Sequence, residues 1–67
     1  MEKRIFTKMT MLGLLTREMR FSDNGLYIHL YTIFPNGSES YDGTIERQYE
    51  HAIAVEWKKD FSFKEVL

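Results

Sequence analysis

The sequence predicts a mostly-β antiparallel domain, a small meander or barrel-like sheet of four to five strands. Three Asx-Gly pairs, Asn24-Gly25, Asn36-Gly37 and Asp42-Gly43, divide the middle of the chain into short segments. Such pairs supply the positive φ angles that tight hairpin turns require. Apolar and polar residues alternate around the first pair, which is typical of strands with one buried face. The alternative is an α+β arrangement, in which a three-stranded antiparallel sheet carries a C-terminal helix at about residues 44–59.

The N-terminal segment RIFTKMTML favours a strand. Ile5, Thr7, Met9 and Met11 alternate with their neighbours as strand residues do. Ile5, Met9 and Leu12 would also share one side of a helix, and Gly13 interrupts either pattern.

The Asn24-Gly25 pair predicts a hairpin with a defined register. A two-residue loop there pairs Phe21 with Ile28 and Met19 with Leu30. Paired residues share one face of a sheet. One face therefore collects a candidate core, made of Leu15, Met19, Phe21, Ile28, Leu30 and Phe34. The other face carries Tyr27, His29 and Tyr31 beside Thr16, Glu18, Arg20, Ser22 and Ile33.

Two further turns are expected after this hairpin. The stretch FPNGS suits a loop of three or four residues because proline precedes Asn36-Gly37. A short polar strand, SESY, follows, and Asp42-Gly43 is expected to turn the chain again.

The stretch YEHAIAVEW supports two interpretations. Tyr49, Ile53, Val55 and Trp57 fall on alternate positions, so a strand is predicted, with Trp57 as a core anchor. The helical alternative has apolar residues every four positions and many helix-forming residues; its stripe is Ile45, Tyr49, Ile53, Trp57 and Phe61. The final SFKE matches a capping box with Ser62 as the N-cap and Glu65 at the third helical position, which predicts a terminal helical turn.

Composition limits the classes of function. The 67 residues (1–67) fit a single small domain with a net charge of −1. There is no cysteine, so disulfides and thiolate-bound zinc are excluded. The chain lacks the basic balance of a duplex-DNA binder, because residues 21–56 hold six acidic side chains and one basic one. No apolar run approaches the roughly 20 residues that a membrane span needs. We expect a cytoplasmic protein with no membrane segment and no cofactor.

The sequence does not predict an enzyme. Its histidines, His29 and His51, are not part of an HExxH pattern, and a metal site would need carboxylates such as Glu50 beside them. No nucleophile-elbow pattern or phosphate-binding glycine cluster is present. We therefore assign no catalytic, cofactor-binding or metal-binding residues.

Five residues are candidates for partner binding: Tyr27, His29, Tyr31, Arg20 and Tyr41. The tyrosine-bearing sheet face could close over as a second wall of the core, bind a protein, or stack nucleobases. The function we predict is a small non-catalytic interaction module that regulates or inhibits a partner protein by surface binding. Its size is typical of proteins encoded by phages or mobile elements. Pairing of an open strand edge could also produce a homodimer.

The alternative function is binding of single-stranded nucleic acid through the aromatic sheet face. Tyr27, His29 and Tyr31 would then stack on bases. Arg17, Arg20 and Lys8 would meet phosphates.

Overall fold

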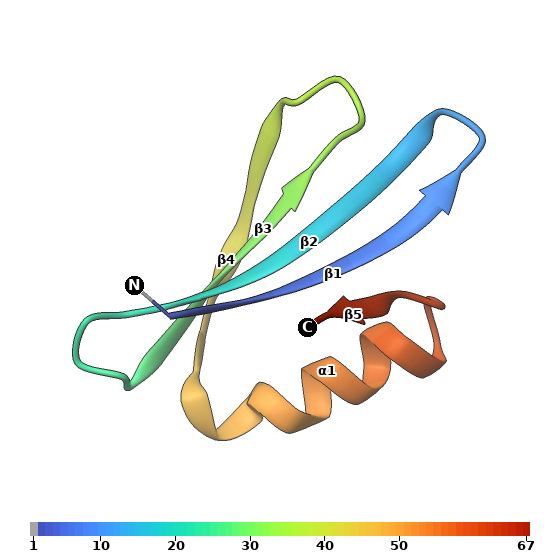
Figure 1. Cartoon of the computed structure of the whole chain (residues 1–67). Helices are drawn as coiled ribbons and strands as arrows, with labels where there is room; N and C mark the ends of the chain where they lie inside the picture. The colour runs from blue at the N-terminus through green and yellow to red at the C-terminus, as the bar shows by residue number, and fades with distance from the viewer. Residues whose placement is uncertain (1) are drawn as a thin grey trace.

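The computed structural model describes residues 2–67 and consists of one open, five-stranded sheet with a helix across one face (Figure 1). Four strands form an antiparallel meander: β1 (Lys3–Thr10), β2 (Gly13–Phe21), β3 (Tyr27–Ile33) and β4 (Glu39–Glu46). A 3-10 turn η1 (Arg47–Tyr49), the helix α1 (Glu50–Lys59) and β5 (Lys64–Val66) complete the chain. The strand order β4-β3-β2-β1-β5 means that α1 carries the chain from one edge of the sheet to the other. The prediction of a mostly-β antiparallel fold is confirmed, and the sheet is open rather than barrel-like.

The register predicted for the central hairpin is confirmed. Phe21 pairs with Ile28 and Met19 pairs with Leu30. The turn itself is wider than a two-residue loop, because Ser22 closes the ladder by donating its N–H to the Tyr27 carbonyl at 2.9 Å. A three-residue loop at residues 35–37 connects β3 to β4, closed by the Phe34 N–H donating to the Ser38 carbonyl at 2.9 Å.

The turn expected at Asp42-Gly43 is wrong, because the chain continues as β4 and forms a β-bulge there. Leu30 pairs with Gly43, whereas the next residue, Tyr31, pairs with Tyr41, so Asp42 is the extra residue. The Asp42 carboxylate accepts a hydrogen bond from the Thr32 hydroxyl at 2.5 Å. A β-bulge requires unusual backbone angles but does not reverse the chain. Gly43 meets this requirement with a φ of 118°.

The core lies between the sheet and α1. The edge of the Phe6 ring meets Trp57 with ring centroids 5.0 Å apart. The buried apolar residues come from three strands, the helix and the segment before β5: Phe6, Met19, Phe21, Ile28, Leu30, Ala54, Trp57 and Phe63. Four predicted core residues are among them, and Leu15 packs beside them. Phe34 is 43% exposed, because β3 ends before it and the turn carries it away from the core.

The strand predicted for YEHAIAVEW is wrong, and the helical alternative is correct for residues 50–59. Only Ala54 and Trp57 of this helix are buried, with Ile53 packed against the core, so the buried stripe is narrow. Tyr49 is 52% exposed, and the apparent alternation therefore did not reflect a buried face. Glu50 in the first turn and Lys58 in the last turn suit the helix dipole. Neither helical segment within residues 2–67 has the length and apolar composition needed to cross a membrane.

The terminal helical turn predicted at Ser62 is also wrong, since residues 64–66 form β5 against β1. Ser62 has a φ of 60°, and the chain turns back towards the sheet there. Glu65 then faces Arg4, which donates hydrogen bonds to it at 2.7 and 2.6 Å. A tertiary ion pair has overridden the local capping signal.

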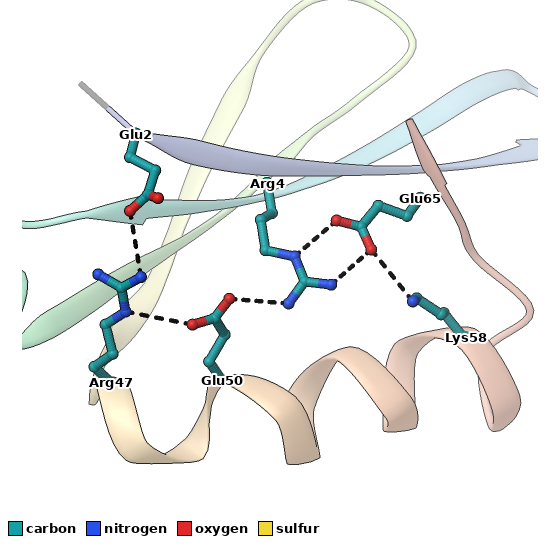
Figure 2. Close-up of polar contacts among 6 residues, drawn as sticks. All are labelled: Glu2, Arg4, Arg47, Glu50, Lys58 and Glu65. Atoms are coloured by element: carbon teal, nitrogen blue, oxygen red, sulfur yellow. Dashed lines mark hydrogen bonds and ion pairs between the residues drawn. The ribbon is translucent and has the colours of Figure 1, made fainter. Parts of the chain in front are cut away.

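A chain of ion pairs joins the helix to the sheet edge (Figure 2). It runs through Glu2, Arg47, Glu50, Arg4, Glu65 and Lys58. Arg4 of β1 lies at its centre and contacts Glu50 of α1 at 3.0 Å as well as Glu65 of β5. One guanidinium therefore holds three elements together.

Candidate functional site

The face of the sheet opposite α1 is not covered by any helix or strand of residues 2–67 (Figure 1). The pairing register places on this open face Lys3, Ile5, Thr7, Met9, Leu14, Thr16, Glu18, Arg20, Tyr27, His29, Tyr31, Ile33, Glu39, Tyr41, Thr44 and Glu46. Tyr27 and Tyr41 are 45% and 58% exposed, and Met9 is 73% exposed. Because the helix lies on the other side, these side chains do not form a second wall of the core.

All five predicted partner-binding residues lie on the open face. Arg20 pairs with His29, and Tyr31 pairs with Tyr41. The bulge is responsible for the second pair. If the ladder continued from the Leu30–Gly43 pair without a bulge, Asp42 rather than Tyr41 would lie opposite Tyr31.

Three of these residues stack on one another. The Arg20 guanidinium carbon lies 3.9 Å from the Tyr31 ring centroid. The Tyr31 and Tyr41 rings are tilted at 55° with centroids 5.5 Å apart. We call Arg20, Tyr31 and Tyr41 the tyrosine cluster.

Hydrogen bonds extend this cluster across β4. The Tyr41 hydroxyl is hydrogen-bonded to the Thr44 hydroxyl, which in turn lies 2.8 Å from Nδ1 of His29. Tyr27 is apart from this network, opposite Glu46 at the other end of β3, and no ring stacking links it to the cluster within residues 2–67. The contacts among Arg20, Tyr31 and Tyr41, together with the hydrogen bond from Tyr41 to Thr44, restrict the conformations of the cluster.

The cations on the open face are paired with carboxylates. Glu18 is buried, with 5% of its surface exposed, and its Oε1 accepts a hydrogen bond from Arg20 Nε at 2.9 Å. Lys3 lies 3.8 Å from the same oxygen, and Arg20 also donates to Glu39 at 2.6 Å. The hydrogen bond to Glu18 is the largest of the effects that raise the pKa of Arg20, and Glu39 adds to it.

Sequence reasoning placed Glu18 on this face but did not identify its role. The register also contains the signal for Lys3 and Glu39, since both lie on the same face as Glu18 and Arg20. What the pattern could not show is that the central strand buries a carboxylate, a group that needs ionic partners away from water.

A second exposed surface was missed altogether. The β1–β2 and β3–β4 turns lie at the same end of the sheet, beyond the helix (Figure 1). They expose Met11 and Leu12 at 103% and 89% of the reference surface, and Leu14 and Phe34 at 47% and 43%. The signal was the position of Met11 and Leu12 between Thr10 and Gly13, which close a two-residue turn.

The histidines do not converge. His29 is on β3 on the open face, whereas His51 is exposed on α1, which covers the opposite face. Within residues 2–67 no three His, Cys, Asp or Glu side chains are grouped as they would be to hold a metal ion.

No family model, curated protein or solved structure matches this chain significantly.

Proposed function

We propose that this chain is a non-catalytic interaction module that regulates or inhibits a partner protein by binding through the open face of its sheet. One observation carries the proposal: Arg20, Tyr31 and Tyr41 contact one another on a sheet face that no other element of residues 2–67 covers, and Tyr41 is 58% exposed there. Tyrosine and arginine are enriched at the centres of protein interfaces.

The cluster also has the rigidity that favours binding. A side chain that is already held in one conformation loses less entropy when a partner covers it. Tyr31 is fixed between Arg20 and Tyr41, and the Tyr41 hydroxyl is fixed by Thr44. A partner would therefore meet a preformed surface.

The same contacts oppose the nucleic-acid alternative. A single strand would need free cations for its phosphates and open ring faces for its bases. Arg20 is bound by Glu18 and Glu39, and it already occupies the face of Tyr31. A protein partner requires neither free cations nor open ring faces.

Site-specific photo-cross-linking in cells that express the protein tests the proposal. A photoreactive phenylalanine analogue replaces Tyr41 in one sample and Tyr49 in the other, since the two side chains are similarly exposed at 58% and 52%. Tyr49 is in η1, away from the open face, and is the matched control. We expect a discrete protein adduct from position 41 only, and its absence, or the same adduct from both positions, would contradict the proposal.

The cluster can then be tested with the cross-linked partner in hand. Tyr41→Ala should weaken binding by about 30-fold or more if this residue is an interface hot spot, whereas Tyr49→Ala should leave affinity unchanged. Sedimentation velocity of the purified chain distinguishes a separate partner from a second copy on the same face. Binding to a mixed single-stranded oligonucleotide that weakens steeply with salt would instead support the alternative.

A further inference from the structure

The outer edge of β1 is only partly covered. β5 pairs with Ile5, Phe6 and Thr7, and it does not reach the distal part of the strand. No backbone hydrogen bond within residues 2–67 joins the outer side of residues 8–10 to another segment. The last three residues of β1, 8–10, are therefore open to another chain on this side.

The backbone groups of Met9 point out of this open edge. The Phe21 N–H donates to the Glu2 carbonyl, which makes Lys3 and Arg20 a non-hydrogen-bonded pair in the β1–β2 ladder. Alternate residues of a strand direct their backbone groups to opposite sides. The backbone groups of the odd-numbered residues of β1 thus point away from β2. Of these residues, Lys3 and Met9 lie outside the ladder with β5, and Met9 is the one in the distal part of the strand.

A groove of about 420 Å³ lies beside this edge, and its charge is positive. It is lined by Thr7, Lys8, Met9, Leu14, Ser62 and Lys64, with no acidic residue among them. Within residues 2–67, neither Lys8 nor Lys64 has a carboxylate within 4.0 Å; every arginine and the lysines at positions 3 and 58 have one. The groove thus combines open backbone, uncompensated cations and the apolar side chains of Met9 and Leu14.

We propose that this edge docks an extended acidic segment of a partner protein, which would add to the sheet next to β5. Its backbone would pair with Met9, its carboxylates would meet Lys8 and Lys64, and its apolar side chains would cover Met9 and Leu14. Strand addition of this kind takes affinity from backbone hydrogen bonds and specificity from side chains.

Charge also selects between the two edges of the sheet. β4, the opposite edge, carries Glu39, Asp42 and Glu46 and is interrupted by the bulge. It would repel an acidic segment, and a bulged edge pairs poorly. The distal edge of β1 lies apart from the tyrosine cluster, whose members are on β2, β3 and β4, so this proposal and the proposed function can fail independently.

An NMR titration of the ¹⁵N-labelled full chain tests the proposal with a capped hexapeptide of alternating Asp and Val. We expect amide shifts confined to the distal part of β1 and the start of β5, with saturation at millimolar peptide or below. A hexapeptide of alternating Lys and Val should not bind. The Asp–Val peptide methylated on every backbone nitrogen keeps its charge but lacks N–H donors, and it should not bind either.

Three variants complete the design. Lys8→Gln combined with Lys64→Gln should weaken binding of the Asp–Val peptide at least tenfold. Lys59→Gln should not, because Lys59 is an exposed lysine of α1, away from the groove, that forms no ion pair within residues 2–67. Met9→Pro removes the outward N–H without removing a hydrogen bond to β2, and it should abolish binding. Equal affinity for the Lys–Val peptide, shifts centred on β4 or the tyrosine cluster, unchanged affinity in the double lysine variant, or no shifts at all would overturn the proposal. Self-association through this edge would also overturn it, because the occupant would be a second copy.

Discussion

Acid should destabilise this protein through Glu65 in particular. Glu65 accepts two hydrogen bonds from Arg4, at 2.7 and 2.6 Å, and lies 3.2 Å from Lys58 Nζ (Figure 2). These contacts, with the Arg4 hydrogen bonds the largest, lower the pKa of Glu65 from 4.5 to about 2. Replacing Glu65 by glutamine removes the charge but keeps the size of the side chain.

The size of the effect follows from this difference in pKa. If the unfolded chain titrates at 4.5 and the folded one at about 2, linkage gives at most about 3.4 kcal/mol of stability from the ionised form. Arg4 and Lys58 are 26% and 45% exposed, so water and salt screen the interaction. We therefore expect about 1–2 kcal/mol.

The direction of the pH dependence follows from the lowered pKa. A carboxyl that is more acidic in the folded state contributes its full stability above the unfolded pKa. That stability is lost as the pH falls from 4.5 towards about 2. The difference in unfolding free energy between wild type and Glu65→Gln should accordingly be largest at pH 7 and shrink over this acidic range.

Urea unfolding followed by the fluorescence of Trp57, which is 2% exposed and the only tryptophan, measures this difference across pH 2 to 7. Glu56→Gln is the matched control, because Glu56 is exposed on α1 and its side chain makes no hydrogen bond or ion pair within residues 2–67. Its curve should run parallel to that of wild type. A difference between wild type and Glu65→Gln that stays constant from pH 7 to pH 2 would refute the linkage argument.

Three further predictions concern stability. Trp57→Ala should cost about 3–5 kcal/mol, a large part of the roughly 3–10 kcal/mol expected for a domain of this size, and circular dichroism should show loss of cooperative thermal unfolding. Gly13→Ala should lower Tm more than Gly43→Ala. Both glycines have a positive φ, at 122° and 118°, but a Cβ at Gly13 would lie 3.0 Å from the Pro35 side chain, whereas a Cβ at Gly43 would meet open space. Equal losses of Tm would contradict this prediction. Arg20→Met should cost about 1–3 kcal/mol in urea unfolding because it leaves the buried Glu18 carboxylate with only a lysine at 3.8 Å, and adding Glu18→Gln should recover part of this loss.

The local parts of the fold were predictable from the sequence. Asn24-Gly25 and the alternation on either side of it gave the register that pairs Phe21 with Ile28. That register alone placed Arg20, Tyr27 and Tyr31 on one face. The Asn24-Gly25 turn and the alternation beside it both depend on residues close together in the chain, so they can be recognised without knowledge of the tertiary structure.

The parts that failed depend on distant contacts. Residues 50–59 alternate in polarity, but the helix needs only Ala54 and Trp57 to cover the core, and the strand interpretation places these two residues on opposite faces. The terminal segment forms a strand, in which Glu65 accepts a hydrogen bond from Arg4, a residue 61 positions away in the sequence. Local propensity cannot include partners at such separations.

Tyr41 was correctly predicted to be an exposed aromatic residue, but the turn expected after it does not form. The sequence predicts that Tyr41 is exposed because it lies between the turns expected at Asn36-Gly37 and Asp42-Gly43. The structure shows a bulge there instead, and the bulge is what brings Tyr41 opposite Tyr31. The exposed aromatic and the Asx-Gly pair were both informative, but an Asx-Gly pair can make either a turn or a bulge, and only the pairing with β3 distinguishes them.

Glu18 connects the fold to the kind of partner we propose. A carboxylate that is 5% exposed on the central strand requires compensation, and Arg20 and Lys3 supply it. Once these cations are bound in place, they cannot also neutralise phosphates without leaving Glu18 unpaired, which would cost stability as well as binding energy. Arg20, Tyr31 and Tyr41 can still contact, as one group, a surface that makes hydrogen bonds and van der Waals contacts. The requirement to bury Glu18 on the open face therefore favours a protein partner over a polyanion.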